Sequence, residues 1–218
     1  MKMVILKSRY AMEGCIVGIG KMYSKTPAYI YGFHGCNMDT FKNVIYNNQS
    51  LNKSVNKYDW LGNGIYFWEN SYQRAFEWAT SRFGKDNAAV IGAFIDLGHC
   101  LDLTDCEYVS VLKKGHSILQ SIFKEEGKEM PKNRKGKFTN DVLLRDLDCA
   151  VIEQIHIYNM DEGLSFYDSV RGIFTEGKEI YPGSALLEKT HTQVCIVNPN
   201  CIKGYFVPRE ADENYVIP

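Results

Sequence analysis

The sequence predicts a single α+β domain, and three observations carry that prediction. Segments with strand-like and helix-like patterns are interspersed along the chain without a regular βαβ rhythm. Neither an internal repeat nor a low-complexity linker divides the 218 residues, a length that suits one good-sized domain. Apolar residues make up 45% of the chain and charged residues 23%, which is ordinary for a globular protein. We therefore treat residues 1–218 as one domain in which helices flank a sheet.

The first half of the chain alternates strands with amphipathic helices. Aromatic and small residues alternate in PAYIYGF, which runs into a turn predicted at His34-Gly35. The apolar residues of MDTFKNVIY recur at helical spacing, and a loop rich in asparagine and serine follows. Polar residues also stand where a second helix would be capped. The predicted elements are strands at 27–33 and 65–67, helices at 38–46 and from Asn70 or Ser71 to near Gly84, and a loop at 47–56.

The second half follows the same logic. AAVIGAFIDL is an apolar run of strand length between Asn87 and Gly98. Two helical patterns come next, and the second has Thr139 or Asn140 as its candidate cap. The segment PKNRKGK between them carries four basic residues and no acidic one. The predicted elements are a strand at 88–97, helices at 109–123 and 141–158, and strands at 170–174, 192–197 and 202–207.

Charge and cysteine usage narrow the class of protein. A formal net charge of -1 gives no global field that would draw the chain to nucleic acid or to an anionic membrane. The apolar run from Met3 to Leu6 is too short for a signal peptide, and no apolar stretch is long enough to span a membrane. The seven cysteines form no CxxC pair, which argues against disulfides and a zinc site. The sequence thus predicts a reduced, cytoplasmic protein with no metal and no membrane partner.

Three stretches carry the functional signal: FHGC at 33–36, LGNGIYF at 61–67 and HTQVCIVNP at 191–199. In this order, with a helix expected behind each of the first two, they resemble the H-Y-E branch of the ADP-ribosyltransferase superfamily. That branch includes the poly(ADP-ribose) polymerase catalytic domains and the diphtheria-toxin type. The resemblance covers residues 28–207. It implies an ADP-ribosyltransferase-like core with a split β-sheet, and NAD+ as co-substrate.

The resemblance also implies roles for particular residues. His34 would hydrogen-bond the adenosine ribose of NAD+. Gly35 and Gly64, which have no Cβ, would let the backbone approach the cofactor closely. Tyr66 would stack on the charged nicotinamide ring, with Phe76 or else Trp78 completing the sandwich. Each residue has a plainer interpretation: His34 as a core or turn histidine, Tyr66 as sheet core, and Phe76 as part of a core-facing helical stripe. Only the ordered set favours a nucleotide pocket.

One position departs from the family pattern. The late strand of the family begins with a glutamate that supports the oxocarbenium-like centre, and this chain has Gln193 there. A neutral amide orients a hydroxyl group but supplies neither negative charge nor a general base. Glu176, Glu179 and Glu188 lie in the segment just before this strand. We select Glu176 as the substitute carboxylate, and Arg171 as a residue near the phosphates or an ordinary surface arginine.

The predicted function is that of a mono-ADP-ribosyltransferase, which cleaves NAD+ and transfers ADP-ribose to a protein or nucleic-acid acceptor. Such an enzyme would act as a toxin, a phage-defence effector or a host-modifying effector. Gln193 keeps open an inactive module that only binds NAD+ or ADP-ribose, and a glycohydrolase would use water as acceptor. The basic segment 131–137 is either a solvated loop or a contact for nucleic-acid phosphate. We expect His34, Gly35, Tyr66 and Gln193 to line one pocket.

Overall fold

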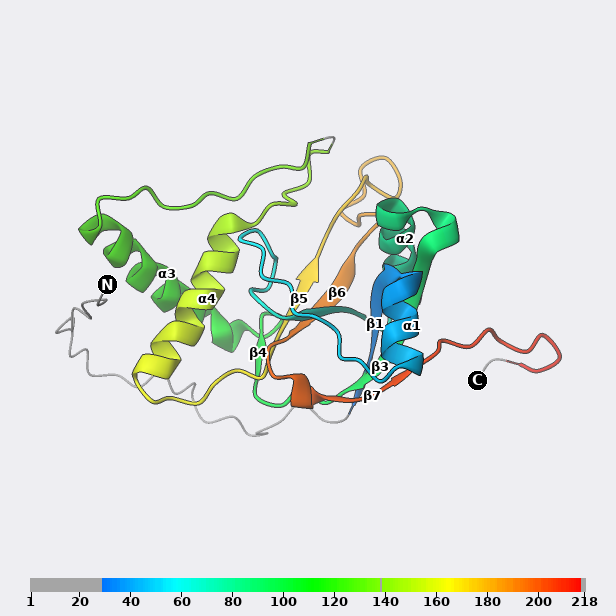
Figure 1. Ribbon diagram of the computed structural model, residues 1–218. Coiled ribbons are helices and arrows are strands. Elements are labelled where there is room, and N and C mark those ends of the chain that lie inside the picture. Colours follow the sequence, from blue (N-terminus) through cyan, green and yellow to red (C-terminus); the bar gives the residue numbers. More distant parts are fainter. Residues whose placement is uncertain (1–28, 138, 217–218) are drawn as a thin grey trace.

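The computed structural model describes residues 29–137 and 139–216, and within them it has the predicted α+β class (Figure 1). Four α-helices accompany seven strands that are hydrogen-bonded in the order β4-β5-β6-β2-β1-β3-β7. The strands are β1 (Ile30–Asn37), β2 (Ile65–Glu69), β3 (Ala88–Ile95), β4 (Cys100–Asp102), β5 (Ser169–Phe174), β6 (His191–Ile196) and β7 (Ile202–Phe206). The helices are α1 (Met38–Tyr46), α2 (Tyr72–Phe83), α3 (Val109–Glu125) and α4 (Asp146–Asp161).

The sheet is least tightly joined between β1 and β2. Strand β1 pairs with β3 along its whole length, from Ile30 to Asn37. Its pairing with β2 is limited to Gly32 with Glu69 and Phe33 with Trp68. The resemblance implies a split sheet; within the described residues the seven strands form one hydrogen-bonded sheet with a short seam at β1–β2. Because the paired register ends at Phe33, the two strands separate just beside His34.

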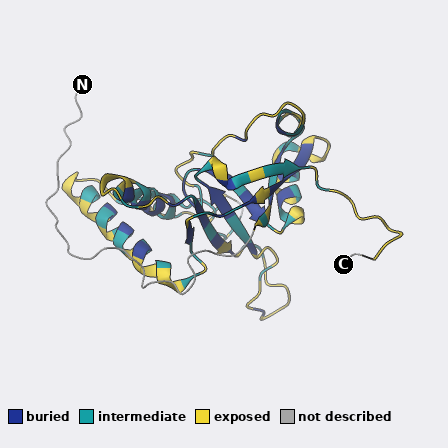
Figure 2. Ribbon diagram, turned by 90° about the horizontal axis from the view of Figure 1, so that it is seen from below, coloured by how far each residue is buried: buried dark blue, intermediate teal, exposed yellow. Residues whose placement is uncertain are grey.

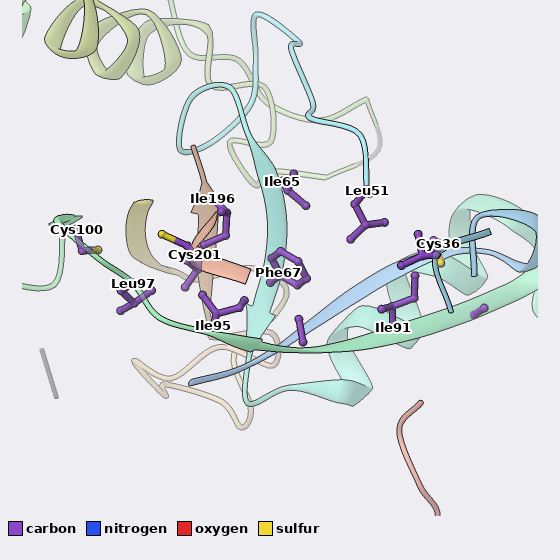
Figure 3. Close-up of a cluster of buried hydrophobic side chains, with 14 residues drawn as sticks. Cys36, Leu51, Ile65, Phe67, Ile91, Ile95, Leu97, Cys100, Ile196 and Cys201 are labelled. Atoms are coloured by element: carbon purple, nitrogen blue, oxygen red, sulfur yellow. The ribbon is translucent and has the colours of Figure 1, made fainter. Parts of the chain in front are cut away.

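One face of the sheet is covered by α1. Phe67, Ile91, Ile95 and Val194 project from this face into a buried cluster, against which the apolar side of α1 packs. Figure 3 shows how the side chains of this cluster converge from β1, β2, β3 and β6. We call this cluster the α1-side core. Its side chains alternate along each strand with those of the other face, as the pleat requires.

The opposite face is covered by two separate groups of helices. Helix α2 packs on Phe33, Trp68 and Val90 near β1 and β3. Helices α3 and α4 pack on Tyr66, Cys195 and neighbouring residues in a second buried cluster, which we call the α4-side core. Figure 1 shows the two groups at opposite ends of the sheet, with β5 and β6 between them. Figure 2 shows that burial is concentrated in the central strands and on the inward sides of the helices.

Two element boundaries and one additional strand differ most from the sequence-based expectation. Strand β1 runs through the predicted turn at His34-Gly35 and ends at Asn37, whose side chain caps α1 by accepting from Thr40 N. The reason is the long partner strand β3, which holds all of Ile30–Asn37 in the sheet. Helix α4 begins at Asp146 rather than at residue 141, because Arg134 and Leu144 form a β-bridge that keeps the preceding segment extended. The short strand β4 was not predicted, and residues 27–28 of the first strand lie outside the described residues.

None of the helices within the described ranges is both long enough and apolar enough to cross a membrane.

The packing around Gly64 gives a test of the fold. A Cβ built on Gly64 would lie 2.5 Å from Cys195 Sγ and 2.6 Å from the Ile196 carbonyl oxygen, so Gly64→Ala should be overpacked. We expect it to lower the free energy of unfolding by about 1–3 kcal/mol, measured by urea denaturation. Gly204→Ala in β7 is the control, because a Cβ there meets no atom within 4 Å. A Gly64→Ala protein as stable as the Gly204→Ala protein would contradict this packing.

Candidate functional site

The three motif strands are neighbours in the middle of the sheet. Gln193 lies on β6, Tyr66 on β2 and His34 on β1, and these strands follow one another in the sheet order. Trp68 of β2 is paired with Gln193 on one side and with Phe33 on the other. Segments that are far apart in the sequence are therefore adjacent at the point where the sheet opens.

His34 bridges that opening. Its Nδ1 lies 2.8 Å from the Tyr66 carbonyl oxygen, and because a carbonyl only accepts, Nδ1 carries the proton. Burial lowers the pKa of His34, while the hydrogen bond to Tyr66 acts in the opposite direction. The His34 ring lies 5.7 Å from the ring of Phe67, so it sits on the side of the α1-side core. His34 is thus a neutral imidazole that links β1 to β2 where their backbone pairing has ended.

Tyr66 does not share a pocket wall with the His34 ring, which corrects the expectation that these residues line one pocket. The Tyr66 side chain packs against the α4-side core, on the other face of the sheet. Its hydroxyl donates to the Gly62 carbonyl oxygen at 2.6 Å and accepts from Leu61 N at 2.8 Å. The two side chains differ because the β1–β2 register sets Phe67, rather than Tyr66, opposite His34. Tyr66 holds the turn before its own strand.

The glycines of the second motif are explained by the same turn. Gly62 has φ +80°, and a Cβ there would lie 2.6 Å from Glu153 Oε1 on α4. The two carboxylate oxygens of Glu153 accept from Asn63 N and Asn63 Nδ2, each at 2.7 Å. At Gly64 the missing side chain leaves room for Cys195 and the β6 backbone. The turn therefore packs between α4 and β6, and it is held by hydrogen bonds to Glu153. The sequence did not single out Glu153.

Gly35 is likewise packed against protein rather than open space on its Cα side. The nearest atom to a Cβ at this position is the carbonyl oxygen of Ala75 on α2. Only a glycine lets α2 lie so close to β1. At Gly35 and Gly64 the space that a side chain would take is thus filled by other parts of the protein, so only the backbone groups of these glycines could contact a cofactor.

Gln193 and Glu176 meet around one buried histidine. His191 Nδ1 donates to the Lys189 carbonyl oxygen at 2.7 Å, which leaves Nε2 of the neutral ring as an acceptor. Gln193 Nε2 lies 3.0 Å from that Nε2, so the amide nitrogen faces the ring and the amide oxygen is directed away from it. Glu176 Oε1 lies 3.7 Å from His191 Nδ1. The carboxylate selected from the sequence thus stands one residue away from Gln193.

The electrostatics of this cluster are dominated by burial. Burial lowers the pKa of His191, and the Arg74 guanidinium adds to that effect. Burial also raises the pKa of Glu176, against the attraction of Arg74 and Lys189. Arg74 of α2 contacts Glu77 at 2.7 Å and Glu176 at 3.2 Å, so one guanidinium faces two carboxylates. Lys189 acts on both carboxylates as a second cation, from farther away than Arg74.

Two buried donors beside this cluster have no hydrogen-bond partner among the described residues. They are Arg74 Nε and Trp68 Nε1. Trp68 is only 7% exposed and is the register partner of Gln193, with its ring 6.4 Å from the His191 ring. A buried donor without an acceptor costs free energy unless a ligand or water supplies one. The position of these donors marks the surroundings of Gln193 as the candidate site.

Aromatic side chains of α2 lie next to Trp68, whereas the expectation from the sequence was that Phe76 or Trp78 would lie opposite Tyr66. Phe76 packs in the cluster of Trp68 and Val90 and stacks on Tyr72, with ring centroids 6.0 Å apart. Trp78 lies 5.8 Å from Trp68. Trp68, and not Tyr66, is therefore the aromatic residue of β2 that is paired with Gln193. Sequence reasoning missed Trp68, Arg74 and His191, although Trp68 directly follows the GIYF motif and His191 stands two residues before Gln193.

Other candidate residues have different tasks. Arg171 is paired with Glu69 at 2.6 Å and with Asp102 at 3.1 Å, so it joins β5 to β4 and, across β6, to β2, and it is not free for phosphate. Glu179 and Glu188 accept from backbone N–H groups of their own loop, those of Gly183 and Lys178. In the part of the chain that the structure describes, no three metal-ligating side chains are grouped to hold an ion.

The orientation of Gln193 can be tested without any substrate. Gln193→Glu replaces the amide that donates to His191 Nε2 by an anion, which stabilises the imidazolium form. We expect the pKa of His191, now lowered by burial, to rise in this variant. The measurement is an NMR pH titration of the histidine ring signals, assigned with a His191→Gln sample. In Gln193→Met, which has neither donor nor charge, the pKa should stay low. An unchanged pKa in Gln193→Glu would mean that residue 193 does not face the ring.

No family model, no curated protein and no solved structure matches this chain.

Proposed function

We propose that the protein is a mono-ADP-ribosyltransferase that cleaves NAD+ and transfers ADP-ribose to a macromolecule. The observation that carries the proposal is the adjacency of the three motif strands in the order β6-β2-β1, with the sheet opening beside His34. The motif resemblance requires these three strands to be adjacent, although the three motifs are far apart in the sequence. The split-sheet core of that superfamily is part of the same proposal, with the short β1–β2 seam as its support.

The chemistry of the site suits the breaking of a glycosidic bond. In the proposed reaction the bond between the ribose C1′ and the nicotinamide nitrogen breaks, and its electron pair neutralises the nicotinamide as it leaves. The acceptor nucleophile then bonds to C1′ and loses its proton to water. The positive charge that develops at C1′ is stabilised by the carboxylate of Glu176, which lies beside the histidine that Gln193 contacts. This carboxylate replaces in part the glutamate that Gln193 lacks.

The remaining groups bind and orient. The Gln193 amide oxygen, directed away from His191, accepts from a ribose hydroxyl. The unpartnered Arg74 Nε and Trp68 Nε1 donate to oxygen atoms of the dinucleotide. The Trp68 ring takes the place beside the nicotinamide that the sequence assigned to Tyr66, with Phe76 and Trp78 behind it. His34 holds β1 and β2 together at their opening, with its ring on the α1 side of the sheet.

The acceptor is a protein or a nucleic acid, and the adjoining loops offer its contacts. Gly177 N donates to Asp141 Oδ2 at 3.1 Å, which tethers the loop after β5 to the segment that follows the basic residues. Within the basic segment, Arg134 is paired with Asp146 at 2.9 Å. Lys132 and Lys135 are near enough in sequence to extend the same surface. An intracellular toxin, a phage-defence effector and a host-modifying effector all fit such an enzyme.

Two alternatives remain tied to Gln193. A module that binds NAD+ or ADP-ribose without turnover would need only the orienting groups, and a glycohydrolase would use water as acceptor. Incubation with NAD+ labelled in the adenylate part separates them. We expect label on a macromolecule from a cell extract; free labelled ADP-ribose would indicate the glycohydrolase. Unreacted NAD+ that nevertheless binds in calorimetry would indicate the binding module, and the absence of both binding and turnover would overturn the proposal.

The role of Glu176 gives a second test. Removing a group that stabilises developing charge typically lowers the rate by about 10²–10³-fold, and we expect that loss in Glu176→Gln while NAD+ binding stays nearly intact. Glu179→Gln in the same loop is the control, because an amide oxygen still accepts from Gly183 N. Thermal unfolding checks that the loss of the ion pair with Arg74 leaves the fold intact. Equal turnover by both variants would reduce Glu176 to a structural partner of Arg74.

A further inference from the structure

A cavity that Gln193 does not line is found between α3 and α4 and against β5. Its volume is about 630 Å³, which falls in the range of small-molecule sites. Most of its wall is apolar, and the polar side chains are few. The lining residues used below are Trp60, Leu112, Lys113, His116, Arg145 and Phe174.

One wall of the cavity is a preformed aromatic corner. Trp60 and Phe174 have ring centroids 4.4 Å apart, and the Arg145 guanidinium lies 4.7 Å and 4.8 Å from the two centroids. Trp60 Nε1 donates to the Leu143 carbonyl oxygen at 2.7 Å, so the indole is held in place and its polar edge is satisfied. The Arg145 Nε donates to the Val142 carbonyl oxygen at 3.2 Å. Rings and guanidinium are therefore fixed before any ligand arrives.

The charges around the cavity have one dominant sign. Lys113 and Arg145 are cationic and His116 is a further donor, whereas the only acidic lining residue is Asp148. Asp148 lies 3.5 Å from Arg145, which offsets one of the two cationic charges. The positive charge of Lys113 on the exposed side of α3 is left over. An apolar cavity with a flat aromatic wall and a net positive mouth matches a planar aromatic molecule that carries an anionic group.

We propose that this cavity is a binding site for a small planar aromatic anion, separate from the NAD+ site. The aromatic part lies against Leu112 and the Trp60–Phe174 corner, and the anionic group faces Arg145 and Lys113. The two sites are neighbours, because the Trp60 ring also stacks on His191 at 6.2 Å with an angle of 24°. A ligand here is one ring away from the histidine that orients Gln193. The site itself does not depend on the proposed transferase activity.

The test uses two dyes of nearly equal shape. 1-Anilinonaphthalene-8-sulfonate carries one anionic group, and N-phenyl-1-naphthylamine lacks it. We expect the anionic dye to bind at one site per chain, and binding is followed by dye fluorescence excited through Trp60. The anionic dye should bind at least about tenfold more tightly than the neutral dye, because a charge-assisted hydrogen bond contributes a free energy of that size. Leu112→Trp fills the cavity and should abolish binding. Val109→Trp on the same helix is the control, because Val109 is 45% exposed and does not line the cavity.

The contribution of positive charge to binding is tested by Arg145→Gln. Because Arg145 also packs on two rings, a second variant, Lys113→Ala, removes a charge from an exposed position where folding is at little risk. Both should weaken the anionic dye and leave the neutral dye unchanged. Equal affinity for the two dyes, or tight binding that persists in Leu112→Trp, would overturn the proposal. Displacement of the dye by NAD+ in direct competition would also overturn it, because the cavity would then belong to the nucleotide site. No displacement by NAD+, together with the loss in Leu112→Trp, supports a separate site.

Discussion

The structure depends on how the short strand β2 is held. It pairs with β6 over four residues but with β1 over only two, so it joins the two halves of the sheet through a narrow seam. Three side-chain contacts secure it. His34 binds the Tyr66 carbonyl oxygen at the seam, the Tyr66 hydroxyl binds the turn that precedes the strand, and Glu153 of α4 clamps Asn63 in that turn. The two hydrophobic cores therefore meet at a strand whose position is fixed largely by polar contacts.

This arrangement explains why polar groups gather at the centre of the sheet. Helix α2 and the pair α3–α4 cover opposite ends of one face, and the sheet between them carries Trp68, His191 and Gln193. Burial keeps the His191 imidazole neutral, and the Lys189 carbonyl oxygen fixes its tautomer. The unprotonated Nε2 of that ring then accepts from the Gln193 amide nitrogen, which directs the amide oxygen away from the ring. Arg74 draws Glu176 to the other side of the same ring. His191 thus lies between the two side chains of the candidate site, the Gln193 amide and the Glu176 carboxylate.

The aromatic residues divide the same face into two compartments. The Trp60 ring stacks on His191, and it also contacts Phe174 and the Arg145 guanidinium. On one side lies the cluster around Gln193, and on the other lies the cavity between α3 and α4. Because the indole nitrogen of Trp60 is bonded to Leu143, the dividing ring has little freedom to turn. The same indole thus lines the cavity and packs on His191.

The sequence by itself determined the α+β class and most elements, because local hydrophobic periodicity fixes which segments form helices and strands. Helix α1 at Met38–Tyr46 and the strands around Gln193 and Tyr66 follow from such patterns. It also selected Glu176, a position the structure brings next to the candidate site. Only the tertiary structure decided which face each motif residue occupies, since β-pairing register assigns His34 and Tyr66 to opposite sides. It likewise decided the roles of Trp68, Arg74 and His191, because burial and orphaned donors arise from contacts between segments that no local pattern records.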